Sequence, residues 1–425
     1  MDHFELKDGV LHAEDVALTL IAEAVGTPVY VYSTATIERH VQVFRDALAG
    51  AGDGAPLIAF AVKANPNGAV LTTLARLGLG ADVVSGGELA RALHAGIPAE
   101  KVVFSGVGKT AEEMAKALIA GIGQFNVESE PEVETLSAVA TALGKTARIA
   151  FRVNPDVDAG THAKISTGKS ENKFGVPIDR VVRSYADAAA LPGIEVVGVA
   201  VHIGSQLTDL APLEAAFGKV GALIDTLRAA GHDIRTADLG GGLGVPYDPA
   251  QPVPPSPAAY GEMVRRATAG WNVRLMFEPG RVIVGNAGAL LTRVVRVKQG
   301  AAQSFVIVDA AMNDLMRPSL YDAWHDIRAV IPSGDRVRAN VVGPVCETGD
   351  TFATDRALDR LAEGDLAVFM TAGAYGATMA NTYNSRALTP EVMVSEGRFA
   401  VVRARQPIEA LLAQDSLPDW LEQKD

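Results

Sequence analysis

One lysine stands where an apolar run of the sequence stops. Residues 57–62 are all apolar, Lys63 follows them, and Asn65-Pro66 comes directly afterwards. Six apolar residues in a row predict a strand buried on both faces, and the residue before a proline is pushed out of helical space. Lys63 is therefore expected at the C-terminal end of a strand. An amine among apolar groups is desolvated toward its neutral form, which can make a Schiff base; the alternative is a lysine held in an ion pair at a barrel rim.

Two further strand candidates end in residues that could do chemistry. One carries Asp82, which could hold the lysine ammonium or cap a turn; Glu88, six residues later, is already explained by a helix cap. The other ends in His202 with Ser205 beside it, which places a flat ring and a hydroxyl at the rim. A single histidine is more often structural, so His202 alone decides nothing.

The last two strand candidates end in a glycine run and in an acid. In Gly240-Gly241-Gly242, several amides without side chains could converge on an anion, although this is not the spacing of a dinucleotide site. Glu278-Pro279-Gly280-Arg281 ends the eighth strand, where the acid could also form an internal ion pair. A Schiff-base lysine, a phosphate cradle, a ring to stack and a carboxylate together suit pyridoxal 5'-phosphate. Glu278 would then keep its pyridine nitrogen protonated.

A regular alternation of apolar strand and amphipathic helix must position these residues. Eight strand candidates occur, at residues 57–62, 82–84, 102–104, 124–127, 147–153, 196–202, 236–239 and 273–277. This alternation predicts an α/β protein with a parallel (β/α)8 barrel of the TIM type; a doubly wound open sheet is the alternative. Three helices are expected to start at capping boxes, Ser85-x-x-Glu88, Thr110-x-x-Glu113 and Ser129-x-x-Glu132.

After Arg281 the pattern changes to short β-rich runs. They occupy residues 289–297, 304–308, 336–342 and 366–371. These runs predict a second, mostly β domain over residues 282–425, of a sandwich or barrel-like kind. Short strands in residues 1–34 could pair with it. The barrel, residues 35–281, would then be inserted between two parts of the β domain.

Composition excludes several classes of protein. A chain of 425 residues exceeds what one core usually supports, and its net charge of −12 argues against a nucleic-acid or anionic-membrane surface. No segment approaches the roughly 18 apolar residues of a membrane span, and the N-terminus lacks the pattern of a signal peptide. The single cysteine, Cys346, excludes an intrachain disulfide and fits a reducing cytosol, so a cytoplasmic protein is expected. No metal site is predicted.

Nine segments, in this order along the chain, resemble the diaminopimelate decarboxylase family. This family belongs to the alanine-racemase-like group of pyridoxal phosphate enzymes, together with eukaryotic-type ornithine decarboxylase. The resemblance covers residues 28–405, in segments 61–65, 85–89, 172–175, 202–206, 240–244, 278–281, 317–321, 346–350 and 373–375. Two positions depart from the usual pattern: Gly160, which lies in the flank of a loop, and Thr348, where serine is commoner.

The resemblance implies a role for each matching residue. Lys63 would carry the Schiff base, His202 would stack on the cofactor ring and Glu278 would pair with the pyridine nitrogen. Contacts to phosphate or its surroundings would come from Ser205, Gly241, Gly242, Gly280 and Arg281. Substrate would be held by Arg281, Arg317, Tyr321 and Glu347, with Tyr375 touching both cofactor and substrate and Cys346 acting as proton donor. The family is a homodimer with shared sites, so Cys346 and Glu347 would come from the partner subunit.

The activity implied is the decarboxylation of meso-2,6-diaminopimelate to L-lysine and CO2, the last step of lysine biosynthesis. The alternative is a decarboxylase of a related basic amino acid: D-lysine, D-ornithine, L-ornithine or arginine. Ornithine-type enzymes carry Cys-Asp where this chain has Cys346-Glu347. A racemase of this fold would place arginine at the pyridine nitrogen, which Glu278 argues against. A non-catalytic cofactor-binding barrel would lack the β domain.

Overall fold

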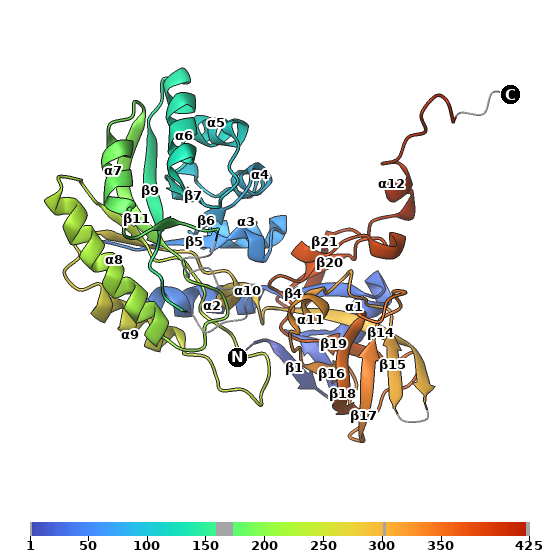
Figure 1. Ribbon diagram of the computed structural model, residues 1–425. Helices are drawn as coiled ribbons and strands as arrows, with labels where there is room; N and C mark the ends of the chain where they lie inside the picture. Colours follow the sequence, from blue (N-terminus) through green and yellow to red (C-terminus); the bar gives the residue numbers. More distant parts are fainter. Residues whose placement is uncertain (1, 159–172, 301–302, 422–425) are drawn as a thin grey trace. The chain divides into compact units, whose positions relative to one another are not determined.

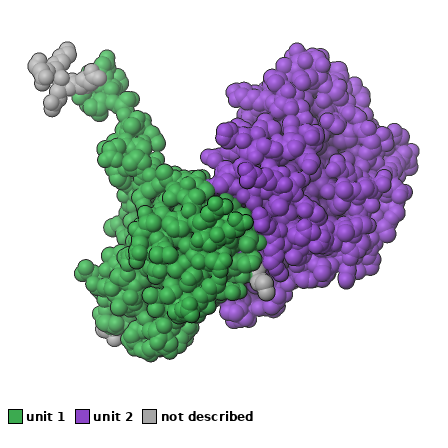
Figure 2. Space-filling model, turned by 180° about the vertical axis from the view of Figure 1, so that it is seen from behind, with its two compact units in different colours: residues 1–35, 286–425 green, residues 36–285 purple. Residues whose placement is uncertain are grey.

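The computed structural model describes residues 2–158, 173–300 and 303–421. The chain divides into two compact units, one of residues 36–285 and one of residues 1–35 together with 286–425 (Figure 2). The expected division was at residues 34/35 and 281/282. The later boundary differs because Arg281 begins a short helix, α10 (Arg281–Val284), which stays with the larger unit. Expectations for residues 159–172, including Gly160 and Asn172, lie outside the described residues.

The larger unit is the eight-stranded parallel barrel, which confirms the predicted fold class (Figure 1). All eight expected strands are present, each within two residues of its predicted limits. Neighbouring strands are parallel in the order β9-β11-β12-β13-β5-β6-β7-β8, and β8 pairs with β9 to close the ring. The strands are β5 (Leu57–Ala61), β6 (Gly80–Val83), β7 (Val102–Phe104), β8 (Gln124–Val127), β9 (Ala147–Asn154), β11 (Ile194–Val201), β12 (Thr236–Asp238) and β13 (Arg274–Phe277); a short β10 (Val176–Pro177) pairs with β9.

Helices cover the outside of this barrel and bury one stripe each. In α8 (Ala211–Ala229) the buried residues include Leu213, Phe217, Val220 and Leu227, which recur at helical spacing. The other helices are α2 (Thr34–Ala47), α3 (Gly68–Arg76), α4 (Gly86–His94), α5 (Ala111–Ala120), α6 (Glu130–Ala142), α7 (Val181–Ala189) and α9 (Pro257–Ala267). Because the helices occupy the outer face, the strand ends remain the part of the barrel that can bind ligands.

The three expected capping boxes have different outcomes. Thr110 and Glu113 form the complete reciprocal box at the start of α5. Ser85 accepts from the amide of Glu88, but the Glu88 side chain accepts from the amide of Val84 rather than that of Ser85. The box at Ser129 is wrong, because its side chain makes no capping hydrogen bond. There Glu132 instead accepts from the buried ammonium of Lys109, a stronger partner, at 2.7 Å.

The smaller unit is mostly β. Its main sheet runs β18-β17-β15-β14-β4-β20-β21, and β14 also pairs with β19, which pairs with β16. These strands are β4 (Val29–Ser33), β14 (Gly288–Gln299), β15 (Ser304–Val308), β16 (Ile327–Ala329), β17 (Arg336–Val342), β18 (Thr351–Asp359), β19 (Leu366–Phe369), β20 (Glu391–Ser395) and β21 (Arg398–Arg403). A second sheet comprises β1 (Phe4–Lys7), β2 (Val10–Ala13) and β3 (Val16–Ala17), followed by α1 (Leu18–Val25); α11 (Arg317–Tyr321) and α12 (Ile408–Leu412) complete the unit.

The N-terminal strand β4 lies inside the main sheet. It pairs antiparallel with β14 and parallel with β20, and all five of its residues are buried. Val29 and Val31 share a core cluster with Leu291 of β14 and with Val392 and Val394 of β20. Among the described residues of the whole chain, we find no helix with the length and apolarity that a membrane crossing requires.

Candidate active site

Lys63 follows β5 in a single 3₁₀ turn, Val62–Ala64. Its Nζ donates to Oδ2 of Asp82 at 2.7 Å, because Ala61 and Asp82 are direct partners on the adjacent strands β5 and β6. The Lys63 side chain is 39 % exposed, so the expectation of an amine desolvated among apolar groups is wrong. The ion pair with Asp82 is present, so the amine is held at the rim of the barrel and can be reached by a ligand. Asp82 is fully buried, and its Oδ1 has no hydrogen-bond partner among the described residues.

Glu278 follows β13 and lies inside the barrel, where it is 8 % exposed. Its Oε1 accepts from Oγ of Ser105 at 3.1 Å and from Nδ2 of Asn126 at 3.2 Å. Burial raises the pKa of Glu278 well above its usual range, and the negative charges of Asp238 and Asp82 add to this effect. The buried site therefore favours the protonated form of the Glu278 carboxyl more than water does.

His202 and the glycine run lie next to each other at two adjacent strand ends. The amide of Gly241 donates to Nδ1 of His202 at 3.2 Å. Desolvation lowers the pKa of His202 well below its ordinary value, and the charges of Arg152 and Lys63 act in the same direction. The ring is therefore neutral, and Nδ1 is its acceptor. A neutral, flat imidazole at the rim can lie against another ring without adding charge.

The glycine run needs its glycines for two separate reasons. Gly240 and Gly242 have φ values of 65° and 111°, in the region that side chains disfavour. A Cβ on Gly241 would collide with the carbonyl oxygen of Glu278, and one on Gly242 would collide with that of Gly204. The backbone therefore approaches its neighbours closely at this end of the barrel. Amides arranged in this way can bind an anion.

Arg281 begins α10 and is 7 % exposed. Its guanidinium donates to the hydroxyl of Tyr247 at 2.6 Å and to Oγ of Ser205 at 3.1 Å. Gly280 is the N-cap residue of the same short helix. These contacts place a fixed positive charge and a hydroxyl side by side, which is a suitable arrangement for a phosphate or carboxylate.

Several polar residues that support this site were not predicted from the sequence. Arg152 in β9 pairs with Glu128 at 3.0 Å and donates to the carbonyl of His202 at 3.3 Å. Asn126 in β8 and Asp238 in β12 reach the Glu278 carboxyl from inside the barrel. Each of these residues interrupts an apolar strand. A charged or amide side chain within a strand that is expected to be buried was the signal that could have identified these supporting residues.

The remaining predicted site residues lie in the smaller unit. Arg317 is the first residue of α11 and Tyr321 the last. Arg317 is 6 % exposed, and its Nη1 lies 3.0 Å from Nε2 of His325. Since a guanidinium can only donate, Nε2 accepts and Nδ1 carries the proton, which it donates to the carbonyl of Met370 at 2.9 Å. His325 is thus a neutral support for Arg317 that no local pattern indicated.

Cys346 and Glu347 lie in the exposed loop between β17 and β18. The amide of Cys346 donates to Oδ1 of Asn384 at 3.1 Å. A hydrogen bond from Tyr383 to Glu347 raises the pKa of the phenol. Asp350 holds the loop by accepting from the amides of Met312 and Val345, each at 2.7 Å. Tyr375 adopts a left-handed backbone conformation, with φ of 56°.

The structure therefore sorts the predicted residues into two groups. The barrel unit brings one group to the C-terminal ends of its strands: Lys63, Asp82, His202, Ser205, Gly241, Gly242, Glu278, Gly280 and Arg281. The β unit carries the other: Arg317, Tyr321, Cys346, Glu347 and Tyr375.

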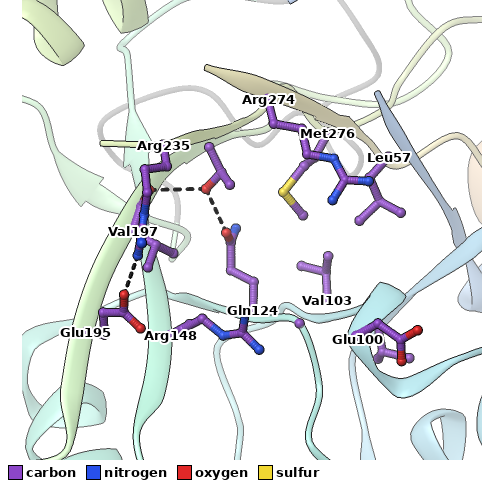
Figure 3. Close-up of a pocket in the computed structure, with 13 residues that line it drawn as sticks. Leu57, Glu100, Val103, Gln124, Arg148, Glu195, Val197, Arg235, Arg274 and Met276 are labelled. Carbon is purple, nitrogen blue, oxygen red and sulfur yellow. Dashed lines mark hydrogen bonds and ion pairs between the residues drawn. The ribbon is translucent and has the colours of Figure 1, made fainter. Parts of the chain in front are cut away.

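A cavity of about 290 Å³ lies at the opposite end of the barrel (Figure 3). It is lined by residues at strand starts, such as Leu57, Gln124 and Thr236, and does not include the candidate active site.

Comparison with known proteins identifies the class. Residues 34–285 match the pyridoxal binding domain of the pyridoxal-dependent decarboxylases, and this is the class that the barrel and its strand-end residues define. Diaminopimelate decarboxylase from Zymomonas mobilis is 56 % identical over 98 % of this chain and 99 % of its own length. The Pseudomonas aeruginosa protein of that name is 52 % identical over the same shares. A crystal structure of the M. jannaschii diaminopimelate decarboxylase with L-lysine has a TM-score of 0.94 and 37 % identity, and the match covers 99 % of each chain. The chain belongs to the diaminopimelate decarboxylase family.

Proposed function

We propose that this chain catalyses the pyridoxal phosphate-dependent decarboxylation of meso-2,6-diaminopimelate to L-lysine and CO2. The observation that carries the proposal is the grouping of Lys63, Asp82, Glu278 and the glycine run at one end of the barrel. The relatives support the choice of substrate, since full-length proteins of 52–56 % identity carry the name diaminopimelate decarboxylase. The solved relative binds L-lysine, the product of that reaction.

The residues of the barrel fit pyridoxal 5'-phosphate. The fit rests on the close backbone approach at Gly241 and Gly242, where a Cβ would collide with neighbouring carbonyl oxygens, and on the Arg281 guanidinium bonded to Ser205, which offers a cation and a hydroxyl to a phosphate. A second observation is Asp82, whose buried Oδ1 lacks a hydrogen-bond partner among the described residues. Lys63 would attach to the aldehyde, His202 would lie against the ring and Glu278 would face the pyridine nitrogen, with Gly280 and Tyr375 as further contacts. The bound cofactor supplies an electron sink for the charge left by decarboxylation.

The chain's own residues prepare the proton positions of the reaction. Asp82 holds the ammonium of Lys63 at the strand end and so orients the amine. Glu278 would keep a pyridine nitrogen beside it protonated, because its carboxylate is stabilised by donors from Ser105 and Asn126. Cys346 presents an exposed thiol as the proton donor that completes the product.

Specificity would come from charges in the β unit. The distal end of diaminopimelate is a zwitterion, so a site that selects it needs both a cation and an anion. Arg317 and Glu347 are the candidates, with Tyr321 and Arg281 as further substrate contacts. Arg317 is fixed in its orientation by His325, which makes it a pre-ordered carboxylate partner. The alternative is decarboxylation of D-lysine, D-ornithine, L-ornithine or arginine. Those substrates lack the distal zwitterion, so a site for them would not need both charges.

We further propose a cytoplasmic homodimer with sites shared between subunits. The exposure of Cys346 and Glu347 on one loop supports this assembly, because groups meant for a partner's site must be exposed on their own subunit. A single cysteine fits a reducing compartment. The proposed activity is tested by assaying purified protein with cofactor against meso-diaminopimelate, D-lysine, L-ornithine and L-arginine. A preference for any substrate other than diaminopimelate would refute it.

A further inference from the structure

Two carboxyl groups share one buried position inside the barrel. Asp238, the last residue of β12, is 1 % exposed, and Glu278 is 8 % exposed. Nδ2 of Asn126 donates to Oδ2 of Asp238 at 2.8 Å and lies 3.2 Å from Oε1 of Glu278. One amide nitrogen therefore reaches an oxygen of each carboxyl group, which places the two acids close together inside the barrel. Two buried carboxyl groups that share a site cannot both ionise at low cost, and sharing one proton relieves the repulsion.

The orientation of Asn126 is fixed from the opposite end of the barrel. Its Oδ1 accepts from Nε2 of Gln124 at 2.8 Å. Oε1 of Gln124, which is labelled in Figure 3, accepts from Oγ1 of Thr236 at 2.8 Å. Gln124 and Thr236 both line the cavity at the strand starts. Because Oδ1 is occupied by a donor, Asn126 must present its N–H groups toward Asp238 and Glu278.

Asp238 also connects Glu278 to the glycine run. Its Oδ1 accepts from the amide of Gly240 at 2.9 Å. The carbonyl of Gly240 in turn accepts from the amide of Glu278 at 2.8 Å. Asp238 is therefore bonded directly to the glycine run and is linked to Glu278 through Gly240 and Asn126, which connects the two elements that are proposed to hold the two ends of the cofactor.

We propose that Asp238 is a positioning residue that acts through Glu278: it shares one proton with Glu278 and fixes that carboxyl beside the glycine run. The proposal deepens the proposed function and rests on Glu278 facing the cofactor ring. The charged groups that face Glu278 are Asp238, Asp82 and Lys63, so two acids and one base surround it. Strong coupling between two buried acids means that they lose their protons as a pair.

The pair predicts a measurable dependence of stability on pH. Burial raises the pKa of both carboxyl groups above their ordinary values. A raised pKa means that folding favours the protonated form, so this stability is present at low pH and is lost as pH rises through the folded-state pKa. The melting temperature of the cofactor-free full chain should therefore fall between pH 5 and pH 8, partly because of this pair.

The experiment compares Asp238→Asn with the wild type and with Asp225→Asn, a matched control on the exposed face of α8. Asp238→Asn keeps the shape and removes one buried acid. Its melting temperature should fall less between pH 5 and pH 8 than that of the wild type, by at least about 3 °C. The control should follow the wild type. Equal slopes in Asp238→Asn and the wild type would overturn the shared proton.

A second readout uses the loaded enzyme. With the charge beside Glu278 removed, kcat for meso-diaminopimelate should fall about 10- to 100-fold while KM stays within about twofold, because orientation at the reacting centre is lost and substrate binding is not. An unchanged kcat would overturn the positioning role. Inactive wild-type protein would instead refute the proposed function, and the measurement on cofactor-free protein would still decide whether the pair shares a proton.

A third variant covers the case in which Asp238→Asn does not fold. Asn126→Ala keeps both acids but removes the donor that stabilises their charged forms, so their pKa values should rise further. The melting temperature should then fall more steeply with pH than in the wild type, which is the opposite sign to Asp238→Asn. A slope equal to that of the wild type in Asn126→Ala would overturn the proposal by itself.

Discussion

Nζ of Lys63 lies 2.7 Å from Oδ2 of Asp82, with the lysine 39 % exposed and the aspartate fully buried. The amine is thus held in place at the strand end but can be reached by a ligand. Lys63→Ala should abolish the visible absorption band of the protein with cofactor and leave no adduct that borohydride can reduce. Lys116→Ala, on the exposed face of α5, is the control and should keep both signals. A reducible adduct in Lys63→Ala would show that another amine carries the cofactor.

Glu278→Gln should separate cofactor binding from turnover. The amide keeps the size of the side chain and can still accept from Ser105 and Asn126. It has no carboxylate to keep a pyridine nitrogen protonated, so kcat should fall about 10²–10³-fold. Absorption titration should show that the cofactor still binds. Turnover close to that of the wild type would contradict the role of Glu278.

Arg317→Ala should reduce the preference for diaminopimelate over D-lysine. The variant removes a buried cation and leaves the distal carboxylate of the substrate unpaired, which typically costs about 2–5 kcal/mol. The ratio of kcat/KM for the two substrates measures the effect. Arg328→Ala is the control: it removes an arginine that is half-exposed, and it should keep the preference of the wild type. If Arg317→Ala keeps the full preference, the distal carboxylate is bound elsewhere.

Mixed dimers test whether active sites are shared between subunits. Lys63→Ala and Cys346→Ala homodimers should each be inactive. If Cys346 serves the partner's site, a hybrid of the two has one intact site and one site that lacks both groups. Random mixing makes half of the dimers hybrids, so co-expression should restore about a quarter of wild-type activity. No recovery in a sample where mass spectrometry detects hybrids would place Cys346 in its own subunit's site.

Asp314 predicts a pH dependence in the β unit. It is 1 % exposed, and burial raises its pKa to about 6. Because the pKa is raised, the carboxyl stabilises the fold below about pH 4, and this stability is lost as pH rises to about 6. The loss is on the order of 2–3 kcal/mol. Denaturant unfolding at several pH values should show that the free energy of unfolding of Asp314→Asn rises relative to that of the wild type between pH 4 and pH 6. Above pH 6 the difference between the two proteins should stay constant. A constant difference between the two proteins would rule out this titration.

Much of the barrel could be predicted because its strands are apolar runs with polar ends. Lys63 and Glu278 directly follow such runs, and each therefore had to lie at a strand end. The exposure of Lys63 could not be predicted, since it depends on the 3₁₀ turn that follows β5. The start of α6 at Ser129 was predicted correctly, but its capping hydrogen bonds were not, because Glu132 is taken by Lys109, 23 positions earlier in the chain.

Support residues were harder to predict than the residues they support. Asn126 and Asp238 are 112 positions apart and meet only because the barrel closes. His325 supports Arg317 through one ring nitrogen, and nothing in the local sequence indicates which partner that nitrogen will have. Local patterns identify groups that end strands, whereas pairs formed inside a closed sheet require the complete fold.

The position of β4 constrains the order in which a newly made chain can fold. Residues 29–32 pair with residues 288–291, and residues 30–33 pair with residues 391–394. A ribosome releases the first of these strands long before it has made either partner, so five residues that end up buried must wait unpaired while residues 36–285 are synthesised. The barrel can close during that wait, since domains generally fold as units during synthesis. Nascent chains halted before residue 391 would leave one edge of this apolar strand open, and these are the chains most in need of a chaperone.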